Sequence, residues 1–274
     1  MIPLEDNASD ILGKAQRGLG LSDSQLAEKA GIDPARVRRL RDGNLDDKAV
    51  RAVAPILGLD ASSLLDLAQA QWVLERIDDL AGLAQFNTIY GDMTVNAYLV
   101  WDPVAREAVA FDTGADCAEM LARVKSEQLT VKLILLTHAH PDHIEDLAKL
   151  QRETGAPTFI SERELADKAE GIAEGRRFEC GALRIESRLT WGHSRGGMTF
   201  VVEGLARPLA IVGDSMFAAS MGGGAVSYGD ALKNNLEKIL TLPDATIVCP
   251  GHGPLTTVGK EKRENPFFAG RIAR

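Results

Sequence analysis

The chain has 274 residues, 45% of them apolar and 26% charged, which is typical of one large globular domain or of two unequal ones. A net charge of -8 disfavours nonspecific attraction to nucleic acid or to an anionic membrane surface. No apolar run reaches the roughly 20 residues that a membrane helix needs, so we expect no membrane-spanning segment. The three cysteines are scattered and the N-terminus lacks a signal-peptide pattern, which together predict a cytoplasmic protein.

The first 70 residues carry the signals of short helices and no strand signal. Apolar residues recur at helical spacing between positions 7 and 17. The residues predicted to begin the next helices are Ser22, Asp33, Asp46 and Asp60, because their side chains can cap free backbone N–H groups. We therefore expect a small all-α domain at residues 1–70, followed by a helical linker at residues 71–80.

From residue 81 onward, β-branched and apolar runs alternate with amphipathic segments. Strands are predicted at 88–90, 95–101, 108–111, 131–136, 158–160, 198–202, 209–212 and 246–248. Helices are predicted at 117–127, 144–154, 161–169 and 228–240. Strands mixed with crossover helices predict an α/β domain over residues 81–274, in which helices cover the sheets.

The histidines of the chain are unevenly distributed. Of only five, three lie within six residues, in the run His138-Ala139-His140-Pro141-Asp142-His143, directly after the strand predicted at 131–136. A loop at the carboxyl end of a strand is where α/β folds place ligand sites. His138 and His140 can point to one metal ion, while Asp142 and His143 turn toward a second. Imidazole and carboxylate ligands suit zinc, iron or manganese.

The other two histidines, His193 and His252, each follow a glycine, which allows the backbone to approach a crowded centre closely. Asp214 ends another apolar run. Taken together, these residues predict a metal site that uses every histidine of the chain. No histidine then remains for a Ser-His-Asp triad.

The set resembles the metallo-β-lactamase superfamily pattern of HxHxDH followed by His, Asp and His, over about residues 81 to 274. Within that superfamily, Asp112-Thr113-Gly114 and the stretch from Pro250 to Phe267 are most similar to glyoxalase II-like thioesterases. The resemblance implies an αββα sandwich and two divalent metal ions, zinc first, with iron or manganese as alternatives. His138, His140 and His193 would hold the first ion, Asp142, His143 and His252 the second, and Asp214 would bridge them.

Such a pair of ions can hold a bridging hydroxide that attacks an activated carbonyl. The function expected from the resemblance is therefore hydrolysis of a small-molecule thioester or similar ester, with Asp142 also orienting the nucleophile as a catalytic residue. The residues that bind glutathione in relatives have no clear counterparts here. Two other functions stay open: a persulfide dioxygenase-like oxidoreductase with one iron, and a DNA-binding regulator whose metal domain senses a ligand.

Residues 21–43 are similar to the helix-turn-helix of the Cro/repressor class, and the likeness covers roughly residues 8 to 68. It implies that Arg36, Arg38 and Arg39, on the recognition helix, contact DNA. The first 70 residues, however, carry nine Lys and Arg against eleven Asp and Glu, whereas DNA-binding modules are usually basic. A dimerising or protein-docking helical domain is the alternative, and a dimerising one would make the protein a homodimer.

Overall fold

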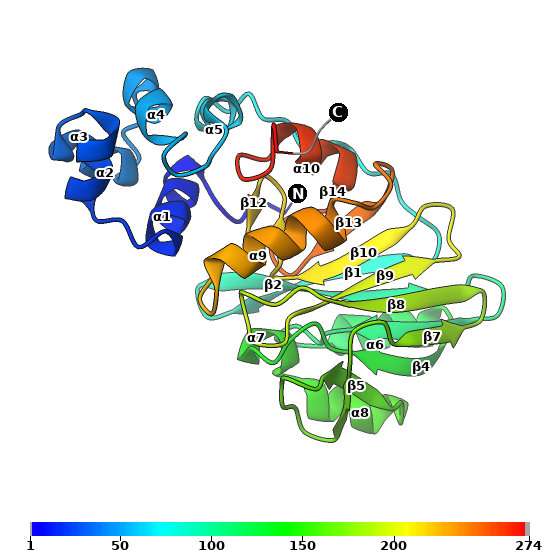
Figure 1. Ribbon diagram of the computed structural model, residues 1–274. Helices are drawn as coiled ribbons and strands as arrows, with labels where there is room; N and C mark the ends of the chain where they lie inside the picture. Colours follow the sequence, from blue (N-terminus) through cyan, green and yellow to red (C-terminus); the bar gives the residue numbers. More distant parts are fainter. Residues whose placement is uncertain (1, 272–274) are drawn as a thin grey trace.

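The computed structural model describes residues 2–271 (Figure 1). Helices alone occupy the described part of the first 70 residues: α1 (Ala8–Gly18), α2 (Asp23–Ala30), α3 (Pro34–Arg41), α4 (Asp47–Val53) and α5 (Ala61–Ala68). The four predicted N-caps are confirmed. Ser22, Asp33, Asp46 and Asp60 each accept a hydrogen bond from a backbone N–H in the first turn of the helix that follows.

The predicted helical linker is wrong, because residues 71–80 form neither helix nor strand. Long-range packing decides the conformation here. Trp72 is buried with Ala218 and Ala219, and Lys260 places its ammonium 4.3 Å from the centre of the indole ring. Farther along, Ile77 and Leu80 pack against the core between the sheets. These contacts outweigh a weak local preference for helix.

Two six-stranded sheets form the rest of the molecule. The first has the order β1 (Leu83–Tyr90), β2 (Met93–Trp101), β3 (Glu107–Phe111), β4 (Thr130–Leu135), β5 (Thr158–Ser161), β6 (Ala169–Ile172). The second has the order β14 (Thr256–Thr257), β13 (Ile247–Pro250), β10 (Leu209–Gly213), β9 (Met198–Glu203), β8 (Leu183–Leu189), β7 (Arg177–Cys180). A small hairpin, β11 (Met216–Phe217) and β12 (Ser220–Met221), follows β10.

The sheets face each other and carry helices on their outer sides, which confirms the predicted mixed α/β class. Phe111 and Leu135 of the first sheet pack against Phe200 and Ile211 of the second. The outer face of the first sheet is covered by α6 (Ala118–Ser126) and α8 (Leu147–Thr154). The outer face of the second sheet is covered by α9 (Tyr228–Asn234), η1 (Asn235–Ile239) and α10 (Val258–Glu264). The four layers are helix, sheet, sheet and helix.

Most predicted strands and helices of this region are present, but the helix predicted at 161–169 is not. Turns follow Ser161, and β6 begins at Ala169 in parallel register with β5. The backbone N–H of Glu162 donates to the Ile172 carbonyl oxygen at 2.9 Å, which ties this segment to the edge of the sheet. Strands β6, β7 and β8 were not predicted from the sequence.

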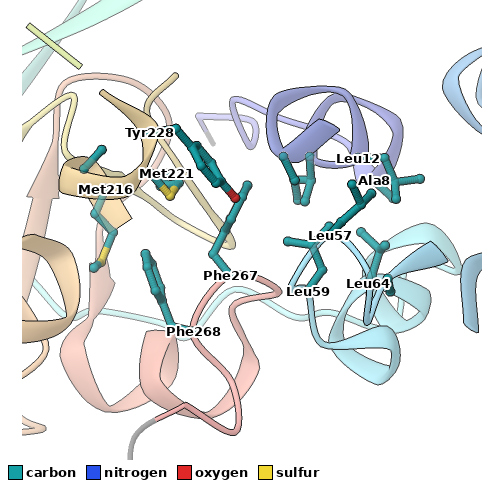
Figure 2. Packing of buried hydrophobic residues seen from close by; sticks show 14 of the residues in the cluster. Ala8, Leu12, Leu57, Leu59, Leu64, Met216, Met221, Tyr228, Phe267 and Phe268 are labelled. Atoms are coloured by element: carbon teal, nitrogen blue, oxygen red, sulfur yellow. The ribbon is translucent and has the colours of Figure 1, made fainter. Parts of the chain in front are cut away.

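The N-terminal helices share a core with the outer layer of the second sheet (Figure 2). Leu12, Leu57 and Leu64 lie on one side of this core, while Tyr228 and Met221 lie on the other side of Phe267. The backbone N–H of Asp60 also donates to the Pro266 carbonyl oxygen at 2.8 Å. The helical segment is thus packed as part of one body. None of the described helices is long and apolar enough to cross a membrane.

Candidate metal centre

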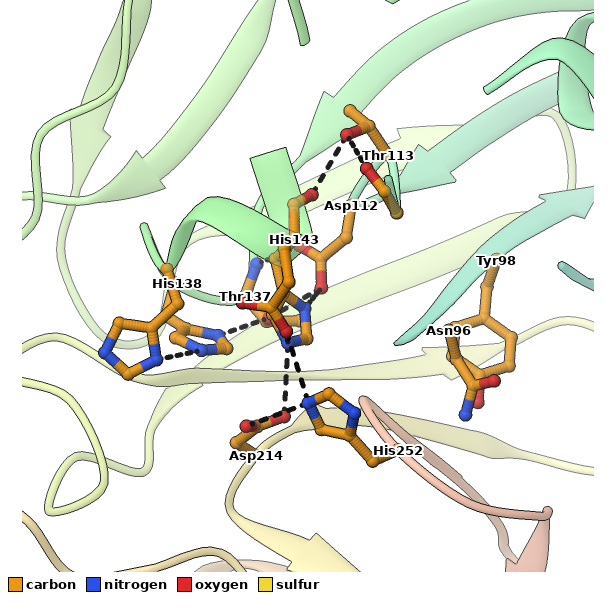
Figure 3. Close-up of polar contacts among 12 residues, drawn as sticks. Asn96, Tyr98, Asp112, Thr113, Thr137, His138, His143, Asp214 and His252 are labelled. Atoms are coloured by element: carbon orange, nitrogen blue, oxygen red, sulfur yellow. Dashed lines mark hydrogen bonds and ion pairs between the residues drawn. The ribbon is translucent and has the colours of Figure 1, made fainter. Parts of the chain in front are cut away.

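Four loops bring the seven predicted ligands together at one edge of the two sheets (Figure 3). The loop after β4 and the short helix α7 (Pro141–Ile144) carry the HxHxDH residues. His193 lies in the loop between β8 and β9, Asp214 directly follows β10, and His252 follows β13. The ligand atoms form two neighbouring groups. The first is His138, His140, His193 and Asp214, and the second is Asp142, His143 and His252.

The first group is the more accessible of the two. His140 and His193 are partly exposed, whereas His138 and Asp214 are buried. Nδ1 of His140 lies 3.0 Å from Nε2 of His138 and 3.0 Å from Nε2 of His193. Nε2 of His193 lies 3.3 Å from Oδ2 of Asp214.

In the second group, Oδ2 of Asp142 lies 3.3 Å from Nε2 of His252 and 3.5 Å from Nε2 of His143. Asp214 also reaches this group, because its Oδ1 lies 3.2 Å from Nε2 of His143 and its Oδ2 lies 3.4 Å from Nε2 of His252. One carboxylate therefore contacts both groups, in the position expected of a bridging ligand.

These distances fit a shared cation. Ligands bound to a tetrahedral ion at about 2.0–2.1 Å lie about 3.3 Å from one another. Nε2 of His143 and Oδ1 of Asp214 are also buried and, although 3.2 Å apart, neither makes a hydrogen bond of normal geometry among the described residues. Buried polar atoms are normally paired, since an unpaired one costs about 1–3 kcal/mol. The donor set and its geometry support divalent metal binding.

Contacts behind the histidines fix which ring nitrogen faces the centre. Nδ1 of His193 lies 3.0 Å from the Gly223 carbonyl oxygen, and Nδ1 of His252 lies 2.7 Å from that of Thr94. A carbonyl oxygen can only accept, so each Nδ1 carries the proton and each Nε2 presents its lone pair. His140 differs, because its Nδ1 faces the centre.

Asp112 is a residue of the site that sequence reasoning missed. Its Oδ2 lies 2.8 Å from Nδ1 of His143 and accepts a hydrogen bond from Thr137 Oγ1 at 2.7 Å, while its Oδ1 accepts from the Thr137 N–H at 2.7 Å. Asp112 also adopts a φ of 55°, a left-handed conformation that Asp tolerates better than most residues. The available signal was an Asp-Thr-Gly triplet directly after a predicted strand.

Close backbone approach explains the glycines before the two distant histidines, as predicted. A Cβ on Gly251 would collide with Asp214 Oδ1 and lie 2.6 Å from Cε1 of His143. Gly192 has a φ of 134°, and a Cβ there would collide with the backbone of Ala231 in α9. The loop of His252 is also held from the other sheet, since the Tyr98 hydroxyl donates to the Pro250 carbonyl oxygen at 2.7 Å.

Charges in the centre are tightly coupled. Burial would raise the pKa of Asp214, but the imidazoles of His252 and His143 hold that pKa well below its usual range. Burial disfavours the charged form of His143, yet Asp214 and Asp112 raise its pKa to about 10. Burial lowers the pKa of His138 well below its usual value. The centre therefore keeps its carboxylates ionised, and these attract a cation that competes with protons for the same lone pairs.

The three arginines predicted to contact DNA lie on α3, away from this centre. Arg36 is half-buried and forms an ion pair with Asp46 at 2.8 Å, while Arg38 and Arg39 are exposed. Contact of these residues with DNA stays a prediction.

A family model described as the metallo-beta-lactamase superfamily matches residues 90–252. A probable metallo-hydrolase of Bacillus subtilis is 32% identical over 205 residues, which cover 66% of this chain and 95% of the relative. A hydroxyacylglutathione hydrolase of Haemophilus influenzae is 27% identical over 198 residues, covering 63% of this chain and 92% of that protein. These relatives support a metal-dependent hydrolase.

Solved structures agree with the sequence matches. A B3 metallo-beta-lactamase, BLEG-1, is 30% identical with a TM-score of 0.59, covering 68% of this chain and all of its own. ETHE1 from Myxococcus xanthus is 25% identical with a TM-score of 0.60, covering 68% of this chain and 85% of its own. TTHA1623, solved in a di-iron-bound form, is 30% identical with a TM-score of 0.54, covering 67% of this chain and all of its own. The expected relationship is thereby confirmed: the chain belongs to the metallo-beta-lactamase superfamily.

Proposed function

We propose that the protein is a hydrolase that depends on two divalent metal ions and acts on a thioester or a similarly activated ester. The observation that carries the proposal is the position of Asp214, whose carboxylate lies 3.2 to 3.4 Å from a ring nitrogen in each of the two groups. A single isolated site would not need a buried carboxylate facing two sets of ligands.

The first ion would be held by His138, His140 and His193, and the second by Asp142, His143 and His252, with Asp214 shared. Zinc suits this donor set, and iron or manganese are alternatives. Divalent ions in such a site lower the pKa of a bound water toward 7 and polarise a carbonyl oxygen.

The residues of the chain supply orientation and charge. Asp142 is a candidate catalytic residue, because its carboxylate lies at the centre and can accept a proton from the attacking water. Burial opposes ionisation of Asp142, but the hydrogen bond with His252 lowers the pKa, so the carboxylate is charged at neutral pH. The partly exposed His140 and His193 mark the side from which a substrate would approach.

A thioester suits this site because a thiolate leaving group needs little protonation by a general acid. The similarity to a hydroxyacylglutathione hydrolase supports the same substrate class. The similarity to a B3 metallo-beta-lactamase makes a β-lactam a necessary member of any substrate panel.

The test is metal analysis of the purified protein together with assays on thioesters, lactones and β-lactams. We expect two metal ions per chain and turnover of at least one thioester. His140→Ala should lose metal from the first group and lose turnover, while Glu119→Ala, on the exposed face of α6, should keep both. Full activity of His140→Ala would rule out the proposed mechanism.

An oxidoreductase with a single iron is the second candidate, and the similarity to ETHE1 from Myxococcus xanthus leaves it open. Metal content separates the two functions. One iron per chain, with oxygen uptake in the presence of a persulfide, would support the oxidoreductase and contradict the hydrolase.

A further inference from the structure

Helix α9 and the π-helical turn η1 pack beside the two loops that carry His193 and Asp214. These two ligands belong to the first metal group. His193 lies in the loop before β9, and Asp214 lies directly after β10. Their separation therefore depends on what holds the two loops relative to each other. Two consecutive asparagines, Asn234 and Asn235, lie where α9 passes into η1.

Asn235 holds the loop of Asp214. Its side chain is fully buried, and its Nδ2 donates to the carbonyl oxygen of Ser215, the next residue after Asp214, at 2.7 Å. Oδ1 of Asn235 is buried without a hydrogen-bond partner among the described residues. Such an acceptor costs stability, and an apolar side chain of similar size would avoid that cost. The amide is therefore better explained by the bond that it makes to the loop than by overall stability.

Asn234 holds the loop of His193. Its Nδ2 donates to the carbonyl oxygen of Trp191, two residues before His193, at 2.8 Å. Between them, Gly192 lies so close to Ala231 that a side chain at position 192 would collide with the backbone of α9. The Gly192 carbonyl oxygen also accepts hydrogen bonds from the N–H groups of Val226 and Ser227, both at 3.0 Å. The loop of His193 therefore packs closely against α9 and is hydrogen-bonded to it.

The π-helical turn η1 begins at Asn235, directly after Asn234, where the two side-chain amides bind the two ligand loops. A π-helical turn inside a helix is uncommon and occurs frequently at functional sites. Here it follows Asn234 directly, so that successive side chains serve two different loops. The loops are also joined to each other, because Ser215 Oγ donates to Thr190 Oγ1 at 2.8 Å.

We propose that Asn234 and Asn235 are positioning residues that set the distance between His193 and Asp214 and thereby control metal affinity in the first group. The inference rests on the proposed metal-dependent function. The effect of Asn234 is selective, because its amide is bonded to the loop of His193, and no hydrogen bond joins either asparagine to α7 or to the loop after β13 among the described residues. Asn235 also acts on the second group, because it holds the loop of the shared Asp214.

The test is titration of the metal-stripped full-length protein with Co²⁺ and with Zn²⁺, in the parent and in Asn234→Ala and Asn235→Ala. We expect the first-group dissociation constant to rise roughly 10–100-fold, the range seen when residues behind metal ligands are removed. In Asn234→Ala the second-group constant should change by less than about threefold, whereas in Asn235→Ala it should also rise, because Asp214 is shared. The visible spectrum of Co²⁺ in the first group should change as well, which a loss of overall stability alone would not cause.

Asp102→Asn is the control for lost stability. Asp102 is also buried, and its carboxylate accepts hydrogen bonds from the N–H groups of Val104, Ala105 and Ala182, at the end of β3 that lies away from the metal centre. This variant should lose stability and keep both metal constants. Should Asn235→Ala fail to fold, Asn234→Ala carries the same test.

Two results would overturn the inference: unchanged first-group affinity in both variants, or equal weakening of both constants in all three. Failure of the proposed function looks different, since the parent itself would then bind no metal pair.

Discussion

Asp6 and Ser220 are hydrogen-bonded across 214 positions of the chain, with Ser220 Oγ donating to Asp6 Oδ2 at 2.6 Å. Lys14 of α1 donates to the same carboxylate oxygen at 2.5 Å and to the Met221 carbonyl oxygen at 3.0 Å. The N-terminal segment is therefore fastened to the β11–β12 hairpin. Two residues beyond Met221, the Gly223 carbonyl oxygen contacts His193. The N-terminal helical segment therefore holds the hairpin whose following residues contact the ligand His193.

Asp6→Asn should destabilise the whole protein. The Asp6 side chain is 8% exposed and that of Lys14 is 16% exposed, so the substitution leaves a largely buried ammonium with a weaker partner. Removing one member of a buried ion pair costs about 3–5 kcal/mol. Urea unfolding followed by circular dichroism should show that loss in a single transition, because the helices and the second sheet share a core. Glu203→Gln, which breaks an exposed pair with Arg184, should cost at most about 1 kcal/mol. Equal losses in the two variants would contradict this role of Asp6.

Gly251→Ala should abolish metal binding in the second group. The new Cβ would lie 2.6 Å from Cε1 of His143 and would collide with Asp214 Oδ1, whereas carbon atoms in contact normally lie about 3.5–4.0 Å apart. Metal content of the purified variant measures the effect. The matched control is Gly229→Ala in α9, where no atom beyond the neighbouring residues and backbone of its own helix lies within 4 Å of the added Cβ. Normal metal content in Gly251→Ala would show that the backbone approach is not required.

Asp112→Asn should weaken metal binding through His143. The carboxylate accepts from Thr137 through one oxygen and from both Thr137 and His143 through the other. An amide has one acceptor, so its NH₂ group must face one of these donors. If it faces His143, the ring moves its proton to Nε2 and no longer offers that nitrogen to a metal ion. We expect roughly 10–100-fold weaker binding in a Co²⁺ titration.

Asp102→Asn controls for lost stability in that experiment. Asp102 is similarly buried and accepts hydrogen bonds from the N–H groups of Val104, Ala105 and Ala182, far along the chain from any ligand. This variant should unfold more easily and bind metal normally. Equal metal affinity in the two variants would show that Asp112 does not orient His143.

Local chemistry explains which parts of the fold could be predicted from the sequence. Ser22 and Asp60 mark helix starts because a capping side chain satisfies N–H groups of its own first turn. Strands such as β10, buried along their whole length, stand out as apolar runs. Strand β8 was not predicted, although its buried Leu183, Ile185 and Leu189 alternate with polar residues as in a half-buried strand. The linker at 71–80 was mispredicted because distant packing around Trp72 decides its path.

The same distinction holds for the metal centre. The ligands could be predicted because His138, His140, Asp142 and His143 crowd into one loop, and because so few histidines remain elsewhere. Asp112, Asn234 and Asn235 could not, because each acts on a ligand loop that only the folded chain brings near. Unlike Asp142, these three side chains lie outside the histidine motif, so their roles become visible only from the groups that they contact.

Ionisation of Glu261 should lower the free energy of unfolding as the pH rises from about 5 to about 8. Glu261 is fully buried in α10, where it accepts hydrogen bonds from Thr256 Oγ1, Asn265 Nδ2 and the Ala219 N–H. Burial outweighs these bonds and raises the pKa of Glu261 from 4.5 to about 7. A pKa raised on folding means that the folded state binds the proton more tightly. The resulting stabilisation is complete below about pH 4.5 and is lost as the pH rises through about 7, a change on the order of 3 kcal/mol.

Glu261→Gln isolates this contribution, because an amide keeps the shape and does not titrate. Its NH₂ group can face the Thr256 hydroxyl while its oxygen accepts from Asn265 and Ala219, as the protonated acid would. Urea unfolding of the metal-stripped parent and variant should therefore be compared at pH 5, 6, 7 and 8, with chelator present so that metal binding does not contribute. The variant should gain stability relative to the parent as the pH rises, since only the parent must ionise a buried carboxyl. Glu119→Gln, at an exposed site, should follow the parent at every pH. Parallel curves for the parent and Glu261→Gln would mean that Glu261 ionises in the folded protein as easily as in the unfolded chain.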